Sequence, residues 1–170
     1  MSLEEAPGAE TGLAALHRDH YRSLVRLAAV LVDDVATCEE LVQDAFVAVL
    51  ARRSAVGDAA RLPAYLRSAV LNRARSHLRR RRTSERPRPL ALVRTEPSAE
   101  AGALLDEEHQ EVLAALRALP ERQREVLALR YYIDLSEADI AATLGIGAGT
   151  VKTHAQRGLA ALHQTLGERR

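Results

Sequence analysis

The apolar residues of this chain recur every three or four positions over long stretches, and this helical period restricts the fold more than any other feature. Along residues 16–31 one side of the predicted helix is apolar, while arginines occupy another side. The apolar positions are Leu16, Leu24, Leu27, Ala28 and Leu31. No segment shows the sustained alternation of a half-buried strand, and aromatic residues make up only 3% of the chain. We therefore predict an all-α protein.

Two further helices are predicted in the N-terminal half. Asp33 and Asp34 end the first helix, and Thr37 with Glu40 has the spacing of a capping box for a second helix that extends to about Arg52. Glycine and proline bracket a loop at residues 57–63, and residues 64–82 then have the pattern of one continuous helix. The buried side chains predicted for these two helices are Cys38, Leu41, Val42, Ala45, Val49, Leu66, Ala69, Val70, Ala74, His77 and Leu78.

The helical period stops after residue 82. Residues 83–105 contain three of the six prolines and no repeating apolar spacing, which is typical of a flexible linker. A second helical unit begins near Asp106 and is interrupted by Pro120. We therefore predict two small helical domains, at residues 13–82 and 106–167, which are joined by this linker and preceded by a disordered terminus at residues 1–12.

Charge and cysteine content limit the classes of function. The net charge of +1 excludes a uniformly basic surface, so a site for nucleic acid must come from uneven charge. The single cysteine, Cys38, excludes an internal disulfide. The N-terminal residues are acidic and lack the apolar core of an export signal, and no apolar run approaches the ~18 residues that span a bilayer. We expect a soluble, cytoplasmic protein.

Arginines concentrate along the 64–82 helix and just beyond it. Between residues 67 and 88 the chain holds nine arginines and one acidic residue, and four of the arginines, Arg79, Arg80, Arg81 and Arg82, are consecutive. A solvated helix end would explain one or two of them, but this density favours phosphate binding.

Other side chains near the basic run suit unpaired bases. Tyr65 can stack on a base and Asn72 can bind a base edge, while Arg61 lies in the preceding loop, which offers a pocket for a flipped base. Packing of Tyr65 at the helix start and a loop contact of Asn72 are equally good interpretations.

The second helix carries a polar, acidic outer face. Once its apolar stripe faces the core, Glu40, Gln43, Asp44 and Val47 lie together on the outside. A solvated face is the default interpretation, but an exposed valine among acids also suits a protein partner on the side opposite the basic helix.

A helix-turn-helix is predicted in the C-terminal unit. Ala141, Gly145 and Val151 have the spacing of the small residue, turn glycine and buried aliphatic residue of that motif. Its predicted core stripe is Ile140, Leu144, Val151, Ala155, Leu159, Leu162 and Leu166. The side chains left for DNA are Thr150, Lys152, Thr153, Gln156 and Arg157, and Lys152, the only lysine, falls in the first turn of the predicted recognition helix.

The helix before this motif carries Arg122, Arg124 and Arg130, which can bind phosphates or pair with Glu121 and Glu125. His154 and His163 lack nearby acids or thiols in the sequence, so no metal site is predicted. No pair of nucleophile and base or of carboxylates stands out, and we expect neither catalytic residues nor a cofactor.

Three ordered segments resemble bacterial RNA polymerase sigma factors of the extracytoplasmic-function (ECF) group along about residues 14–166. CEELVQDAFVAVL is similar to the family's DLVQEAF segment, and AYLRSAVLNRARSHLRRRR is similar to its arginine-ended helix. LPERQREVLALRYYIDLSEADIAATLGIGAGTVKTH resembles the family's C-terminal reader. A helix-turn-helix alone would be a weak signal, but three matches around a linker are specific.

The resemblance implies a sigma-two and a sigma-four domain that perform no chemistry and bind core RNA polymerase and promoter DNA. The residues implied for docking on the β′ clamp helices are Glu39, Glu40, Gln43, Asp44 and Val47. Those implied for the −10 element and the opened strand are Arg61, Tyr65, Asn72, Arg73, Arg79, Arg80, Arg81 and Arg82. Those implied for the −35 element are Arg122, Arg124, Arg130, Thr150, Lys152, Thr153, Gln156 and Arg157. The β subunit and an anti-sigma factor are further candidate partners.

Some positions depart from the family pattern. Tyr65 stands where the family often has tryptophan, Gly147 replaces a serine cap, and His154 replaces a frequent arginine. The TVKTH segment also occurs in LuxR-type regulators, but those need an upstream receiver or ligand domain with strands, and none is readable before residue 100. A helical adaptor protein without DNA affinity is a third reading, against which the arginine-rich segment argues.

Overall fold

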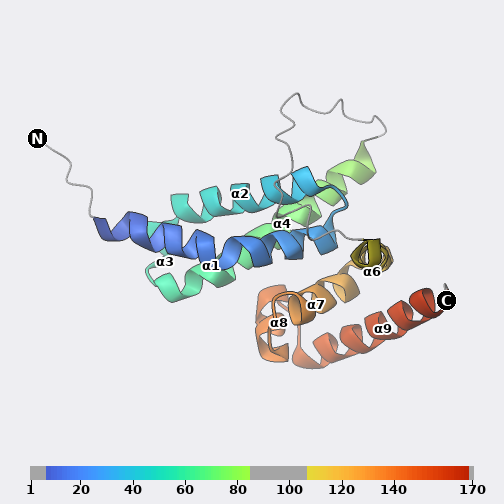
Figure 1. Ribbon diagram of the computed structural model, residues 1–170. Helices are drawn as coiled ribbons and strands as arrows, with labels where there is room; N and C mark the ends of the chain where they lie inside the picture. The colour runs from blue at the N-terminus through green and yellow to red at the C-terminus, as the bar shows by residue number, and fades with distance from the viewer. Residues whose placement is uncertain (1–6, 85–106, 169–170) are drawn as a thin grey trace, which may run out of the picture.

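The computed structural model describes residues 7–84 and 107–168. Within these ranges the chain is helical and contains no strand, which confirms the all-α class. The first range forms α1 (Pro7–Leu31), α2 (Val35–Ala51), the short α3 (Arg53–Val56), a 3-10 turn η1 (Ala59–Arg61) and α4 (Leu62–Thr83). The second range forms α6 (Glu107–Ala118), α7 (Glu121–Tyr131), α8 (Glu137–Leu144) and α9 (Ala148–Gly167). Figure 1 shows the two groups of helices packed side by side.

The first helix begins earlier than the sequence pattern predicted. α1 starts at Pro7, within the terminus that was expected to be disordered, and proline suits the first turn of a helix because its missing N–H would have no partner there. Residues 1–6, 85–106 and 169–170 lie outside the described residues, and 85–106 includes most of the predicted linker at 83–105.

The predicted capping box at Thr37 and Glu40 is wrong, because α2 begins three residues earlier. Asp34 is the N-cap of α2, and its carboxylate accepts from the backbone N–H of Thr37 at 2.8 Å and from the Thr37 hydroxyl at 2.6 Å. An aspartate can cap a helix as well as a threonine can, so Asp34, which precedes Thr37 in the chain, is the N-cap. Thr37 therefore lies inside the first turn.

The loop predicted at residues 57–63 is shorter in the structure, because part of this segment is helical. Gly57 adopts φ 67°, a backbone conformation that favours glycine, and ends α3. Asp58 then accepts from the N–H of Ala60 at 2.9 Å and starts η1, which leads directly into α4 with Pro63 in its first turn. Arg61 therefore lies at a helical boundary and not in an open loop.

The N-terminal core lies where α1, α2 and α4 face one another (Figure 1). Its fully buried side chains include Leu27, Val42, Ala45, Leu66 and Val70. Burial raises the pKa of the Cys38 thiol to about 12, so this residue is a neutral core side chain.

The C-terminal unit contains the predicted helix-turn-helix. The Ser136 hydroxyl caps α8 by accepting from the N–H of Asp139 at 3.1 Å, and Gly145 ends α8 in the left-handed conformation at φ 65°. Gly147 is the N-cap of α9 and has no side chain to accept a hydrogen bond there. Gly145 is therefore the turn glycine that the motif spacing predicted, and its left-handed backbone conformation favours glycine at this position.

The two units share one core. Buried residues from both belong to a continuous apolar cluster, and α1 packs on α6 and α7 while α4 meets α8. At this boundary Arg117 of α6 donates from Nε and Nη2 to the carbonyl oxygen of Ala29 of α1, at 3.0 and 2.6 Å. The two helical units thus pack against each other in a closed arrangement.

Candidate nucleic-acid interface

The exposed face of α9 carries the side chains that the sequence predicted for DNA. Val151, Ala155 and Gly158 are buried against the rest of the unit, and this leaves the opposite face open. The exposed residues are Thr150, Lys152, Thr153, Gln156 and Arg157. Lys152 is the fifth residue of α9, so it begins the second helical turn and not the first. The Thr153 hydroxyl donates to the carbonyl of Gly149 at 3.0 Å.

His154 differs from its exposed neighbours. It is half-buried, and its Nδ1 is buried without a hydrogen-bond partner within the described residues. A family arginine at this position would extend farther from the helix than an imidazole does. The side chain of His154 therefore points partly inward and adds less to the outer face than the sequence alone suggests.

The three arginines of α7 have different surroundings. Arg122 donates to a carboxylate oxygen of Glu125 at 3.0 Å, and Arg130 lies 3.6 Å from Glu137. Arg124 is only 6% exposed and donates to the carbonyl of Arg117 at 3.2 Å. A phosphate contact by Arg124 has no support in this arrangement, because its guanidinium is covered by protein. The alternative of pairing with nearby acids is the one observed for Arg122.

The basic run at the end of α4 is exposed, as predicted. Arg79, Arg80, Arg81 and Arg82 are all exposed. Arg81 pairs with Asp33 at 2.7 Å; burial raises the pKa of Asp33, but the hydrogen bond and charge of Arg81 outweigh that effect and lower it. Both side chains of this pair are more than half exposed, so water screens it and a phosphate can replace Asp33.

The residues expected to contact bases lie along the same helix. Tyr65 is 46% exposed and Asn72 is exposed, so neither is consumed by core packing. The Asn72 side-chain oxygen accepts from Nη1 of Arg75 at 3.3 Å. The partner of Asn72 is therefore a residue of its own helix and not a neighbouring loop. Arg61 is exposed at the start of α4, and Arg73 is half-buried.

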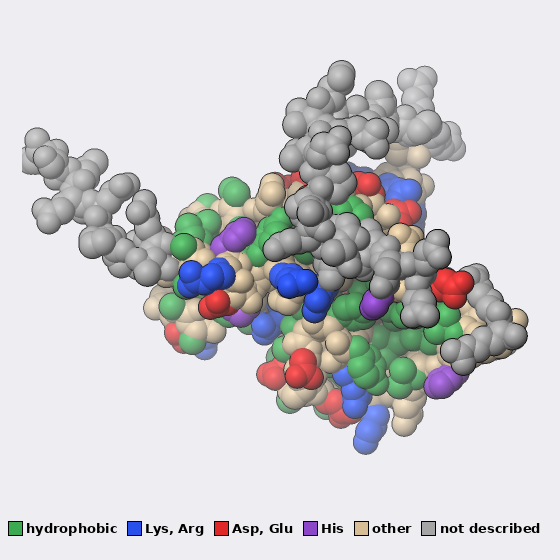
Figure 2. Space-filling view, in the orientation of Figure 1, with side chains coloured by type: hydrophobic (Ala, Val, Ile, Leu, Met, Phe, Trp, Pro, Cys, Tyr) green, Lys and Arg blue, Asp and Glu red, His purple; other side chains and the backbone are tan. Residues whose placement is uncertain are grey.

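The acidic face of α2 is at the surface. Glu40, Gln43 and Asp44 are exposed, Val47 is 66% exposed, and Glu39 is half-buried. This is the arrangement predicted from the apolar stripe of α2. Figure 2 shows that, on the face it presents, small groups of basic and acidic side chains lie close to one another, in keeping with the net charge of +1.

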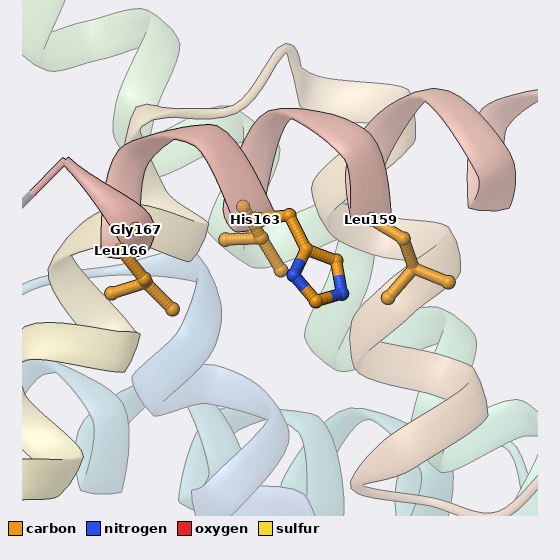
Figure 3. Close-up of a pocket in the computed structure, with 5 residues that line it drawn as sticks. Leu159, His163, Leu166 and Gly167 are labelled. Carbon is orange, nitrogen blue, oxygen red and sulfur yellow. The ribbon is translucent and has the colours of Figure 1, made fainter.

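Part of the predicted core stripe of α9 lines a groove. Leu159, Leu162 and Leu166 are half-buried and, with His163 and Gly167, border a groove of about 300 Å³. Figure 3 shows Leu159, His163 and Leu166 pointing from α9 into this space. The prediction that these leucines are core residues is thus only partly correct, because the neighbouring helices cover this end of α9 incompletely.

Sequence reasoning missed the residues at the boundary between the units. Glu125 of α7 is 1% exposed, and Arg75 of α4 binds it from the other unit. Arg75 was only one of nine arginines in a basic segment, and Glu125 only one of several acids on α7. No local pattern identifies two residues 50 positions apart as partners.

Fold and surface together define the class of protein. A helical chain with a helix-turn-helix, a basic helix and an exposed acidic face has the features of a DNA-binding protein that also has a protein partner. Within the described residues, no helix is long and apolar enough to cross a membrane.

Comparison with known proteins identifies the family. Residues 16–84 match sigma-70 region 2 and residues 109–162 match sigma-70 region 4. The chain is 34% identical to an RNA polymerase sigma-E factor of Streptomyces avermitilis, over 89% of this chain and 83% of the relative. It is 32% identical to the ECF RNA polymerase sigma factor SigL of Mycobacterium tuberculosis, over 96% and 94%. The chain therefore belongs to the sigma-70 family, in its ECF group.

Solved structures agree with this assignment. The sigma factor RpoE of Bartonella quintana, solved in complex with the anti-sigma factor NepR, is similar with a TM-score of 0.66 and 25% identity, over 92% of this chain and 99% of that one. CnrH, solved with the cytosolic domain of CnrY, shares the fold with a TM-score of 0.71 over 93% and 89%. As a sigma factor, this chain binds core RNA polymerase and directs promoter-specific initiation. Nothing in these matches supports a LuxR-type regulator.

Proposed function

We propose that each surface described above performs one task of a sigma factor. The exposed face of α2 docks on the clamp helices of the polymerase β′ subunit, α4 with Arg61 opens and reads the −10 element, and the outer face of α9 reads the −35 element. Residues 13–82 and 106–167 are then the sigma-two and sigma-four domains. The observation that carries the proposal is that most residues of these three sets are exposed, each set on the side of its helix that faces away from the buried stripe.

The division of tasks follows from the side chains present. The α2 face combines acids with the exposed Val47, which suits a protein surface with basic residues and an apolar contact. The run at the end of α4 offers guanidinium groups without acids among them, which suits phosphates. On α9 the exposed amide, hydroxyl and cationic groups are of the kinds that bind base edges in the major groove.

This function requires binding only, so the chain itself is proposed to be a non-enzymatic factor that acts in the cytoplasm with polymerase. An anti-sigma factor is the regulatory partner that we propose, because the similar RpoE structure was solved with such a protein bound.

The docking face can be tested by charge reversal. The double variant Glu40→Lys and Asp44→Lys should lose most binding to core polymerase in co-purification, while its circular dichroism stays native, because both residues are exposed. The double variant Asp19→Lys and Glu168→Lys is the matched control, since it reverses two exposed acids away from α2, one on α1 and one at the C-cap of α9. Run-off transcription should follow the binding result. Equal binding by the two double variants would place the docking face elsewhere.

A further inference from the structure

The boundary between the two units contains a buried ion pair. Arg75 of α4 donates from Nε and Nη2 to the two carboxylate oxygens of Glu125 of α7, at 2.6 and 2.9 Å. The Glu125 side chain is 2% exposed, and the Arg75 side chain is 26% exposed. The hydrogen bond to Glu125 is the largest of the influences that raise the pKa of Arg75. This geometry is the two-pronged arrangement in which a guanidinium binds a carboxylate most strongly.

Arg75 belongs to the helix that we propose for the −10 element. It is adjacent in space to Asn72, whose side-chain oxygen it also binds. Nearer the start of α4, Arg67 is half-buried and its charge interacts with that of Asp139 of α8. Its Nε has no hydrogen-bond partner within the described residues. One stretch of α4 is therefore covered by the helices of the C-terminal unit.

The closed arrangement is too small to read a whole promoter. The −10 and −35 elements are separated by about 25 base pairs, or roughly 85 Å at 3.4 Å per pair. A compact chain of this length has a radius of gyration of about 15 Å. One rigid body of that size cannot place α4 and α9 on both elements, so the units must separate when the promoter is read.

We propose that Arg75 and Glu125 latch the free chain closed, and that Glu125 competes with promoter DNA for helix α4. This inference rests on the proposed role of α4. A carboxylate and a phosphate present similar oxygen pairs to a guanidinium, so DNA replaces Glu125 at Arg75 when the units part. Glu125 keeps one partner after opening, because Arg122 of its own helix binds it at 3.0 Å. Opening therefore leaves no unpaired carboxylate buried in the C-terminal unit.

Two variants and one control test the latch in the full-length chain without polymerase. Glu125→Gln removes the competing charge, and Arg75→Gln breaks the same contact from the more exposed partner. Glu121→Gln is the matched control, because it removes one acid from the same helix at a longer distance of 3.7 Å from Arg75. Small-angle scattering reports the radius of gyration, and calorimetry confirms that each variant is folded.

Both latch variants should have a radius of gyration several ångströms larger than wild type, while the control stays compact. A labelled single-stranded oligonucleotide of roughly 20 nucleotides serves as the DNA probe. Glu125→Gln should bind it at least about threefold more tightly than the control does, because a larger fraction of molecules is open. Arg75→Gln should gain less, since it loses one of its own phosphate contacts.

The outcomes separate the latch from the proposed function. Compact radii for both folded latch variants would overturn the latch, and expansion without tighter DNA binding by Glu125→Gln would overturn the competition. Failure of the proposed function would look different: polymerase loaded with wild type or with the variants would not open or read a promoter, whereas the scattering result would still report the latch.

Discussion

Lys152 and Gly158 lie on the same helix, but one is exposed and tolerates a larger or smaller side chain, whereas the other is buried and does not. Lys152 is exposed on α9, and no hydrogen bond or ion pair is found for it within the described residues. Gly158 is buried on the other face, directly against α7. At the residue scale, the outer face of α9 is free to bind a ligand and the inner face has almost no freedom to change.

Lys152→Ala should weaken binding to −35 DNA. The expected loss is about 1 to 3 kcal/mol if Lys152 contacts a base edge, and less if it contacts only phosphate. Promoter libraries measured in run-off transcription distinguish the two, because a base contact relaxes preference at one position, whereas a phosphate contact lowers the salt slope by about one. Arg18→Ala removes an exposed charge from α1 and is the control. Identical −35 profiles for wild type and Lys152→Ala would show that this lysine is only solvated.

At the scale of the element, close contact between α7 and α9 fixes the position of α9. A Cβ atom added at Gly158 would lie 2.9 Å from Cδ1 of Leu127, 3.3 Å from its Cγ and 3.4 Å from Cβ of Gln123. Leu127 is 1% exposed, so it has little room to move away. The glycine therefore sets the distance between the two helices, a role that the helix-turn-helix spacing did not reveal.

Gly158→Ala should destabilise the C-terminal unit by about 1 to 3 kcal/mol, because overpacking outweighs the gain in helix propensity. Gly149→Ala on the same helix is a matched control, since nothing lies within 4 Å of its added Cβ. The control should be neutral or stabilising by up to about 1 kcal/mol. Urea unfolding followed by circular dichroism measures both. A Gly158→Ala variant as stable as Gly149→Ala would mean that α7 and α9 can shift apart without cost.

At the scale of the whole molecule, the two units form one packed body. Their buried residues make up a single cluster, and Arg117 joins α6 to the carbonyl of Ala29. Shared burial couples the unfolding of one unit to that of the other. The charged contacts at the boundary then decide how readily the units separate.

The full-length chain should unfold in one cooperative transition in calorimetry. Arg117→Ala removes the two hydrogen bonds to Ala29 and should lower the midpoint and broaden this transition, because it weakens the coupling between the units while the shared core remains. Arg130→Ala, which loses an ion pair to Glu137 inside one unit, should lower the midpoint slightly without broadening the transition. Two transitions already present in wild type would show that the shared core contributes little coupling.

Most of the helices could be predicted from the sequence because their signals are local. The apolar period identified α1, α2 and α4, and the spacing of Ala141, Gly145 and Val151 located α8 and α9. Once the buried stripe of a helix was known, the remaining positions had to face solvent. The outer residues of α2 and α9 were therefore predicted correctly as exposed. The helix boundaries were predicted less accurately, because several neighbouring residues can cap a helix. Asp34, not Thr37, is the N-cap of α2, and α1 begins at Pro7.

The tertiary structure alone decided which of the charged side chains remain available. By itself, the sequence determined an all-helical chain with a basic helix, a helix-turn-helix and an acidic face. It did not determine that Arg124 is covered, that Arg75 binds Glu125, or that Gly158 touches Leu127. Each of these depends on residues from different helices meeting in space, and the free energy of burying a charge depends on the partner that it finds there. Helical periodicity specifies a face for each residue, whereas only packing specifies what lies opposite that face.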